Sequence, residues 1–349
     1  MHATTIAVDL AKDVFEIVGT TRDARITERR RLSRRQFERF LDGCPVGTEV
    51  VMEACGTAHY WGRECHRRGL VAHLLPPQYV RAYVRRNKTD RTDAEALLEA
   101  RRCAGLHPVP VKSTEQQALQ ALHTVRAHWQ RARISRLNAL RGLLREQGLA
   151  LPAGAKAVYR RVPAILDDEA VALPSVLRTV IRAVLEELRD LDTRLTRIDH
   201  QLRTIADTVP DAQRLQTIPG IGPIVATSLL GAVPHIHAFP SGRHFASWLG
   251  LTPREVASGS RRWLGSITKR GDVYVRTMLT HGARSVLLNA HRRARAKRHE
   301  LSPLQRWAND VAARRGYNTA VIAVANKLAR IIWAVWRSEQ SYTTSRVAA

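Results

Sequence analysis

Five short apolar runs, each of strand length, occupy the first part of the chain. They are rich in β-branched residues and are separated by polar or glycine-containing breaks, which is typical of strands in a partly buried sheet. Residues 33–41, with Ser33 as N-cap, and residues 57–68 have helical spacing instead. Three strands in hairpin order, followed by strand, helix and strand, predict a mixed α/β sheet flanked by helices. The expected strands span residues 4–9, 14–19, 25–32, 49–54 and 71–75.

Helical periodicity dominates the middle of the chain. Apolar residues recur at helical spacing from 114 to 147, whereas residues 151–174 are irregular, contain three prolines and are expected to form a connector. In the next segment the apolar steps alternate between four and three residues over about four heptads, as in a coiled coil. This helix could pair within the chain, against the first long helix, or between protomers, and the sequence leaves both open. The heptad positions are Leu177, Ile181, Val184, Leu188, Leu191, Leu195, Ile198, Leu202 and Ile205.

The last third of the chain predicts an all-α region that is basic and contains glycine-marked turns. It ends near residue 337, and the residues beyond have the polar composition of a frayed tail. We therefore expect four parts. They span residues 1–110, 111–210, 211–337 and 338–349.

A large excess of positive charge limits the possible partners. The 349 residues include 56 Lys and Arg against 31 Asp and Glu, for a formal net charge of +25. This favours a polyanion, either nucleic acid or a membrane surface, because neutralised phosphates release their counterions. No secretory signal is visible, and prolines and glycines interrupt the uncharged window 215–242, which predicts a buried helix between turns. Nucleic acid is therefore the expected partner, and a membrane is not.

The four cysteines, at positions 44, 55, 65 and 103, include no CxxC pair. This pattern fits buried thiols in a reducing compartment, so we expect a cytoplasmic protein associated with the nucleoid. A zinc site made of Cys55, His59, Cys65 and His66 would match no standard ligand spacing. We interpret the thiols as core residues.

Four acidic residues are candidates for a metal site. Asp9 and Glu53 lie at the ends of two predicted strands, and Asp90 and Asp93 lie at a loop–helix junction, three residues apart. Phosphodiester cleavage needs stabilisation of charge on the attacking and leaving oxygens, which two Mg²⁺ ions about 4 Å apart supply when carboxylates hold them. The alternatives are structural: Asp93 could cap a helix starting at Ala94, and Asp90 could pair with a neighbouring basic residue.

Two glycine-containing segments are candidates for DNA contact. The segment 217–231 resembles the turn of a helix–hairpin–helix, in which Gly220 and Gly222 would let backbone N–H groups face a phosphate; the alternative is a helix start without a ligand. The segment 254–272 mixes Ser, Gly and Arg. Ser258 is our candidate nucleophile, with Ser260 as a substitute, although a serine before glycine commonly serves turn formation alone.

Six ordered motifs extend over most of the chain. They are AVDLAKDVF, VVMEACGT, NKTDRTDAEAL, IPGIGPIVATSLL, FASWLGLTPREVASGS and LGSITKRGDVYVRTMLTHGAR. Together these motifs resemble the insertion-sequence-110 transposases, also called DEDD transposases, and the last motif resembles a signature of one subgroup.

This resemblance implies a RuvC-like, ribonuclease-H-like domain at residues 1–110, a coiled-coil linker at 111–210 that supports oligomer assembly, and a helical transposase domain at 211–337. It implies that Asp9, Glu53, Asp90 and Asp93 bind Mg²⁺ and that Ser258 forms a covalent phosphoserine intermediate. It also implies a bridge recombinase, in which a structured guide RNA pairs with donor and target DNA. Many relatives have glycine where this chain has Ser260.

The expected function is therefore Mg²⁺-dependent DNA recombination by a homo-oligomer, a dimer or tetramer in which sites from different protomers meet. The two alternatives are a junction nuclease without serine chemistry and a non-enzymatic nucleic-acid scaffold. The expected nucleic-acid-binding residues are Lys12, Lys88, Gly220, Gly222, Arg254, Arg261, Arg262, Lys269, Arg270 and Arg276.

Overall fold

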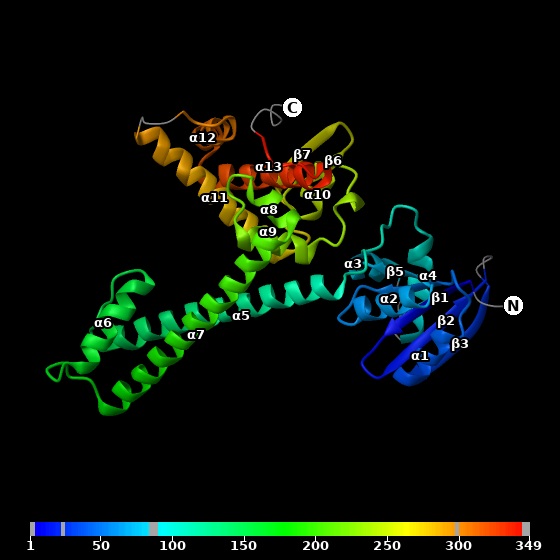
Figure 1. Ribbon diagram of the computed structural model, residues 1–349, viewed down its shortest axis with the longest axis horizontal. Helices are drawn as coiled ribbons and strands as arrows, with labels where there is room; N and C mark the ends of the chain where they lie inside the picture. Colours follow the sequence, from blue (N-terminus) through cyan, green and yellow to red (C-terminus); the bar gives the residue numbers. More distant parts are fainter. Residues whose placement is uncertain (1–3, 22–24, 84–89, 297–299, 344–349) are drawn as a thin grey trace. The chain divides into compact units, whose positions relative to one another are not determined.

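The computed structural model describes residues 4–21, 25–83, 90–296 and 300–343. The chain divides into two compact units, residues 1–117 and 118–349, each with its own hydrophobic core (Figure 1). The four-part division expected from the sequence stays a prediction.

The first unit is built around a five-stranded sheet with the order β3-β2-β1-β4-β5 (Figure 1). β1 (Thr5–Leu10), β2 (Val14–Thr20) and β3 (Ile26–Ser33) are antiparallel neighbours. β4 (Glu49–Glu53) and β5 (Val71–Leu75) continue the sheet parallel to β1. The five predicted strands are confirmed, with small differences at their ends.

Helices cover both faces of this sheet, because alternate side chains of a strand point to opposite faces. α1 (Arg34–Asp42) and α2 (Ala58–Arg67) pack on one face and contribute Phe37 and Trp61 to its core. α4 (Asp90–Arg102) packs on the other face and contributes Leu97. Two short turns, α3 (Pro77–Val80) and η1 (Arg81–Tyr83), follow β5.

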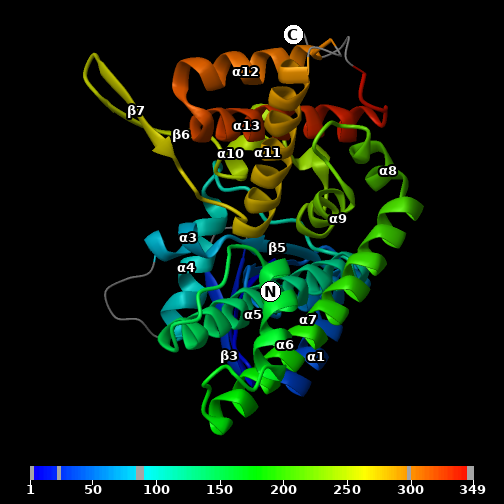
Figure 2. The same cartoon turned by 90° about the vertical axis from the view of Figure 1, so that its left-hand side faces the viewer.

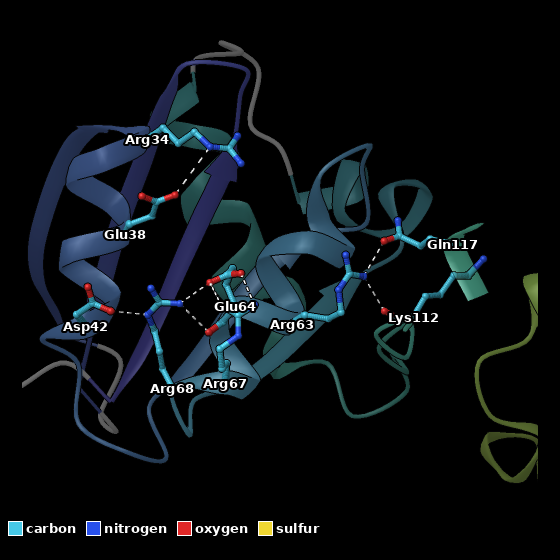
Figure 3. Close-up of polar contacts among 9 residues, drawn as sticks. All are labelled: Arg34, Glu38, Asp42, Arg63, Glu64, Arg67, Arg68, Lys112 and Gln117. Carbon is cyan, nitrogen blue, oxygen red and sulfur yellow. Dashed lines mark hydrogen bonds and ion pairs between the residues drawn. The ribbon is translucent and has the colours of Figure 1, made fainter. Parts of the chain in front are cut away.

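A network of charged side chains fixes α2 against α1 (Figure 3). The buried Glu64 carboxylate accepts hydrogen bonds from Arg67 at 2.7 Å and from Arg68 at 2.7 Å. Arg68 also donates to Asp42, the last residue of α1, at 2.6 Å. The hydrogen bond from Arg68 is the main reason that the pKa of Glu64 lies below its ordinary value. The network holds the helix that follows β4 in a fixed place.

The same helix is tied to the segment that leads out of the sheet. Arg63 donates to the Lys112 carbonyl oxygen at 2.8 Å and to Gln117 Oε1 at 2.6 Å (Figure 3). The Lys112 N–H in turn donates to His59 Nδ1 at 3.2 Å. Burial lowers the pKa of His59 to about 4, so its ring is neutral at pH 7 and can accept this bond.

An antiparallel pair of long helices begins the second unit. α5 (Thr114–Glu146) and α7 (Ser175–Thr208) bury their apolar faces against each other, as Leu140 and Leu188 show. Three ion pairs cross between the helices, and the partner's number falls as the arginine's number rises, which requires antiparallel pairing. They are Arg126–Asp199, Arg133–Asp192 and Arg136–Glu187. Of the two pairings left open by the heptad pattern, the structure contains the one within the chain.

The expected connector between these helices is wrong in part, because it contains a helix. α6 (Ala155–Asp167) places Val158, Val162 and Leu166 at four-residue spacing on one face, and this face packs on α5 and α7. Pro163 lies inside α6. The apolar stripe, which gains its partner only in the folded unit, outweighs the helix-breaking tendency of the proline.

The remaining helices of the second unit share one core. The uncharged window contains α9 (Pro223–Ala232), most of whose residues are buried, as predicted. α13 (Tyr317–Ser338) is the one helix among the described residues with the length and hydropathy of a membrane span, and 56% of that stretch is buried inside the protein. The helices are α8 (Pro210–Gln216), α9 (Pro223–Ala232), η2 (Ile236–Ala238), α10 (Gly242–Trp248), α11 (Val273–Ala296), α12 (Pro303–Arg315) and α13 (Tyr317–Ser338).

The prediction that this part is all-α is wrong at one place. β6 (Pro253–Ser258) and β7 (Arg261–Ile267) form an antiparallel hairpin that extends away from the helices of its own unit (Figure 2). The sequence contained the signal for it, since Gly259-Ser260 between two runs with β-branched or aromatic residues is a two-residue hairpin turn.

A buried histidine links three helices of the second unit. His123 of α5 is 4% exposed, and its ring nitrogens lie 3.0 Å from Tyr274 Oη of α11 and 3.0 Å from Thr227 Oγ1 of α9. Burial, followed by the nearby Arg126, lowers the pKa of His123 to about 4. The ring is therefore neutral in the folded protein at pH 7.

This pKa predicts how stability depends on pH. In the unfolded chain His123 binds a proton near pH 6.5, whereas in the folded chain it does so only near pH 4. The stability is therefore complete above pH 6.5 and falls as the pH falls towards 4, by at most about 3 kcal/mol for this group. Urea unfolding measured from pH 7 to pH 4.5 should show a flatter dependence for His123→Gln than for wild type. His128→Gln, an exposed control on the same helix, should keep the wild-type dependence. Identical slopes for all three proteins would contradict the assignment.

Candidate active site and nucleic-acid interface

Two of the candidate acids lie at the same edge of the sheet. β1 and β4 are adjacent and parallel, and the last residue pair in their register is Val8 with Met52. Asp9 and Glu53 are the next residue on each strand. They therefore lie side by side where the carboxyl ends of the parallel strands meet, the edge at which open α/β sheets bind ligands.

These two acids also share a face of the sheet. Ala7 and Val51, two residues before them, lie in the core beneath α4, whereas Val8 and Met52 lie in the core beneath α1 and α2. Because side chains alternate along a strand, Asp9 and Glu53 point to the face that α4 covers. Both residues are half-buried.

The direction of α4 brings its first turn to this edge. Arg101, near the end of α4, donates to the carboxylate of Glu49, the first residue of β4, at 3.2 Å. Eight residues of helix from Arg101 back to Asp93 rise about 12 Å, and four residues of strand from Glu49 to Glu53 span about 13 Å. Asp93 and Glu53 therefore lie at the same level.

Asp93 also faces the sheet. It lies three and four residues before Ala96 and Leu97, which are both buried in the core beneath α4. Asp93 Oδ1 is buried and has no hydrogen-bond partner among the residues that the structure describes. Such an oxygen is costly unless it binds a cation or a proton donor. The alternative that Asp93 caps a helix at Ala94 is wrong, because α4 begins at Asp90 and Asp93 lies within its first turn.

The fourth acid, Asp90, is the first residue of α4, and its side chain lies outside the described residues. Among the side chains that are described, no three His, Cys, Asp or Glu are close enough together to hold a metal ion. The fold thus brings three acids to one edge and one face without bringing them into a finished cluster. Hard carboxylate oxygens, one of them buried and unpartnered, are nevertheless the donor set that a divalent cation such as Mg²⁺ prefers.

A fifth acid, which sequence reasoning missed, lies beside Asp9. Glu16 of β2 is directly opposite Asp9 in the antiparallel register. Its carboxylate is 3.3 Å from Arg31 Nε, and Arg31 is its register partner on β3. The hairpin order of the first strands was the available signal, since it determines which residue of β2 faces Asp9.

The candidate nucleophile lies in the second unit, at the tip of the β6–β7 hairpin. Ser258 is the last residue of β6, is exposed, and pairs with Arg261 across a two-residue turn of Gly259 and Ser260. Gly259 has φ 56°, which only glycine adopts freely and which suits the first central position of a type II′ turn. Ser260 occupies the second turn position.

Two glycines fix the base of this hairpin. A Cβ on Gly250, which follows α10, would lie 2.0 Å from the Arg270 carbonyl oxygen, and a Cβ on Gly271 would lie 1.9 Å from the Trp248 carbonyl oxygen. The Lys269 N–H also donates to the Gly250 carbonyl oxygen at 3.1 Å. The two backbone segments can approach this closely only because both residues lack a side chain. This contact is the physical reason for the glycines of the LG and KRG motifs.

The predicted basic contacts differ in their freedom to bind phosphate. Arg254, Arg261 and the hairpin-base residues Lys269 and Arg270 are exposed, whereas Arg262 is paired with Glu255 at 2.6 Å. Arg276 is half-buried and donates to the carbonyl oxygens of Leu249 at 3.0 Å and Arg270 at 3.2 Å. Arg276 thus supports the loop that carries the other cations.

The predicted helix–hairpin–helix turn joins α8 to α9 and has a packing role. Gly220, with φ 87°, lies so close to Gly282 of α11 that its Cβ would be 2.7 Å from the Gly282 carbonyl oxygen. Gly222 is the N-cap of α9 and has open space around it. Phosphate binding at this turn stays a prediction. In the first unit, Lys12 is exposed between β1 and β2, and Lys88 lies outside the described residues.

Comparison with known proteins identifies the family. A family model described as a transposase, of the DEDD type of IS110, matches residues 6–148, and the model of the transposase IS116/IS110/IS902 family matches residues 212–299. A probable family 20 transposase of Pseudomonas aeruginosa is 39% identical over 343 residues, which cover 98% of this chain and 99% of that one. The transposase for insertion sequence element IS1111A of Coxiella burnetii is 38% identical and covers 97% of this chain and 90% of its own length. The chain belongs to the IS110 family of transposases.

A more distant relative is named for the inversion of a gene. The pilin gene-inverting protein of Moraxella bovis is 27% identical over 282 residues, 74% of this chain and 75% of its own length. For the IS110-family chain described here, membership establishes an enzyme that cleaves and recombines DNA. Its mixed sheet with helices on both faces fits the ribonuclease-H-like domain that the sequence predicts, followed by a largely helical region.

The glycine contacts predict a specific structural defect. Gly271→Ala introduces a Cβ 1.9 Å from a carbonyl oxygen at φ 90°, so the base of the hairpin must open. Gly259→Ala, at φ 56° with no atom within 4 Å, is the matched control, because it adds strain without a clash. Chemical unfolding should show a loss of about 3 kcal/mol for Gly271→Ala and about 1 kcal/mol for Gly259→Ala. Equal losses would show that the close approach is not a constraint.

Proposed function

We propose that this transposase cuts and rejoins DNA with Mg²⁺ held by Asp9, Glu53, Asp90 and Asp93 and with Ser258 as the nucleophile. The observation that supports the metal site most directly is the buried Asp93 Oδ1 in the first turn of α4, which has no hydrogen-bond partner within the described part of the chain. The cation would neutralise charge that develops on the phosphate and on the leaving oxygen. The acids of the first unit would bind and orient it.

In the proposed step the Ser258 Oγ attacks the scissile phosphorus. An Oγ–P bond forms, one P–O bond of the DNA backbone breaks, the hydroxyl proton leaves Oγ, and the departing DNA oxygen takes up a proton. Two features support this role: Ser258 is exposed at the tip of a hairpin, and Arg261 lies directly opposite it, where a guanidinium can bind a phosphate. A later attack by a DNA hydroxyl on the phosphoserine would release Ser258 and complete strand exchange.

The wider proposal concerns the assembly. We propose that the protein acts in the cytoplasm as a homo-oligomer on donor and target DNA and that a structured guide RNA selects the sequences. The net charge of +25 supports extensive backbone contacts to nucleic acid. The gene-inverting relative supports recombination, rather than cleavage alone, as the outcome. The division at residues 110, 210 and 337 into metal-binding domain, helical linker and serine-bearing domain remains part of this proposal.

The metal site is tested by neutralising its acids. In Asp9→Asn and Glu53→Gln we expect loss of DNA cleavage by at least about a hundredfold, because each removes a carboxylate ligand. Binding is measured independently by thermal unfolding, since Mg²⁺ that binds only the folded state raises the melting temperature of wild type but not of these variants. Glu38→Gln, on the outer part of α1, is the matched control and should behave like wild type. An unchanged Mg²⁺-dependent shift in both acid variants would refute the site.

The serine is tested by trapping its adduct. Wild-type protein incubated with labelled DNA and Mg²⁺ should yield a protein–DNA species that survives denaturation, and Ser258→Ala should abolish it, since no hydroxyl remains to form the ester. Ser260→Ala should retain the adduct. If Ser258→Ala still cleaves at the wild-type rate, the enzyme is a metal-dependent nuclease without serine chemistry.

Sequencing of co-purified RNA tests the guide: a discrete RNA species is expected, and a random mixture of cellular RNA would contradict it.

A further inference from the structure

One face of the β6–β7 hairpin combines an aromatic, an aliphatic and a basic side chain with the proposed nucleophile. The register pairs Ser258 with Arg261 and Val256 with Trp263. Because side chains alternate along each strand, these four residues point to the same side of the hairpin.

The other face is occupied differently. There Arg262 and Glu255 form an ion pair at 2.6 Å, and Leu264 is the register partner of Glu255. The charge on that face is largely neutralised by this pair. Substitutions on the two faces of the hairpin can therefore be compared, because the side chains are similarly exposed but differ in chemistry.

Trp263 is 68% exposed, although tryptophan is the side chain with the most apolar surface to bury. Its ring lies over Gly265, where a Cβ would be 3.5 Å from Trp263 Cη2. The glycine leaves room for the ring along the strand, and nothing in the described part of the unit buries it. Val256 opposite is 57% exposed. A side chain held in this way has a free aromatic surface.

The charges around this face select the occupant. Arg254 and Arg261 are exposed on the hairpin, and Lys269 and Arg270 are exposed at its base. Glu255, the one acid within the hairpin, is paired with Arg262. An exposed aromatic ring beside exposed arginines is the combination that binds single-stranded nucleic acid, since bases stack on the ring and phosphates bind the guanidinium groups. DNA is the substrate of the family, and its bases unstack when strands are exchanged.

We propose that Trp263 stacks on an unpaired DNA base next to the scissile phosphate, with Val256 against the same base and Arg261 on the phosphate. Arg261 and Trp263 are two positions apart on β7, about 7 Å, so one side chain can contact a phosphate while the other contacts a base beside it. The position next to the cut rests on the proposed role of Ser258, whereas the stacking itself does not. The hairpin therefore holds the DNA strand that Ser258 attacks and keeps its base out of the duplex.

The test uses full-length protein that carries Ser258→Ala, so that binding is measured without cleavage. The probe is a single-stranded oligothymidylate of roughly twenty nucleotides with one 5-iododeoxyuridine, which photocrosslinks to a stacked aromatic ring. Mass spectrometry should locate the crosslink at Trp263. Adding Trp263→Ala should remove this crosslink and weaken binding about tenfold, a stacking loss of about 1.4 kcal/mol. Trp263→Phe should restore most of the affinity.

Leu264→Ala on the opposite face is the control, with an exposed side chain at 54%. It should change the affinity less than twofold. Equal weakening by Trp263→Ala and Leu264→Ala, or a crosslink mapped away from the hairpin, would overturn the proposal. A 5-iodouridine RNA of the same length that crosslinks to Trp263 more strongly than the DNA would overturn the assignment of DNA. If Ser258→Ala still forms the covalent adduct while the crosslink at Trp263 remains, the proposed nucleophile fails and the stacking surface stands.

Discussion

The packing of α4 on the sheet is the constraint on which the candidate active site depends. The helix lies across the face to which Asp9 and Glu53 point, and the contact between Arg101 and Glu49 fixes its direction. With that direction fixed, the eight residues of helix from Arg101 to Asp93 and the four residues of strand from Glu49 to Glu53 have nearly the same length. Asp93 therefore lies near the level of Glu53. A reversed helix would bring its basic last turn to the acids. The site is thus a consequence of how one amphipathic helix covers one sheet face.

The arrangement is costly without a cation, and this cost has a functional meaning. Asp93 Oδ1 is buried without a hydrogen-bond partner in the described residues, and Glu16 adds another acid directly opposite Asp9. The rest of the unit offsets the cost, through the stacked and edge-on aromatic rings of Phe15, Phe37 and Trp61 on the other face and through the Glu64 network (Figure 3). Strain at the acids and tight packing elsewhere are what a preformed cation site requires.

The second unit solves a different problem, which is to present a reactive segment rigidly while leaving it exposed. The hairpin contributes little to the core, so its base must be held by backbone. Gly250 and Gly271 permit the two backbone segments at the base to approach each other closely. Arg276 stabilises this approach by donating hydrogen bonds to a carbonyl oxygen of each segment. The helices below, joined by the neutral His123 and its two partners, form the support. Exposure of Ser258 and Trp263 is therefore a property of the hairpin and does not reflect a poorly packed unit.

The sequence by itself determined the five strands, the long helices and the family, because these follow from local periodicity and from motifs of fixed spacing. It also named the four candidate acids, whose role as a metal site stays a prediction. It left open whether the heptad helix pairs within the chain, and it failed at α6 and at the hairpin. The partner of an apolar stripe such as Val158, Val162 and Leu166 is distant in sequence, so only the tertiary structure decides whether the stripe forms a helix despite Pro163. Likewise, the position of Glu16 opposite Asp9 and that of Trp263 on the same face as Ser258 follow from strand register, which is a property of paired strands and not of either strand alone.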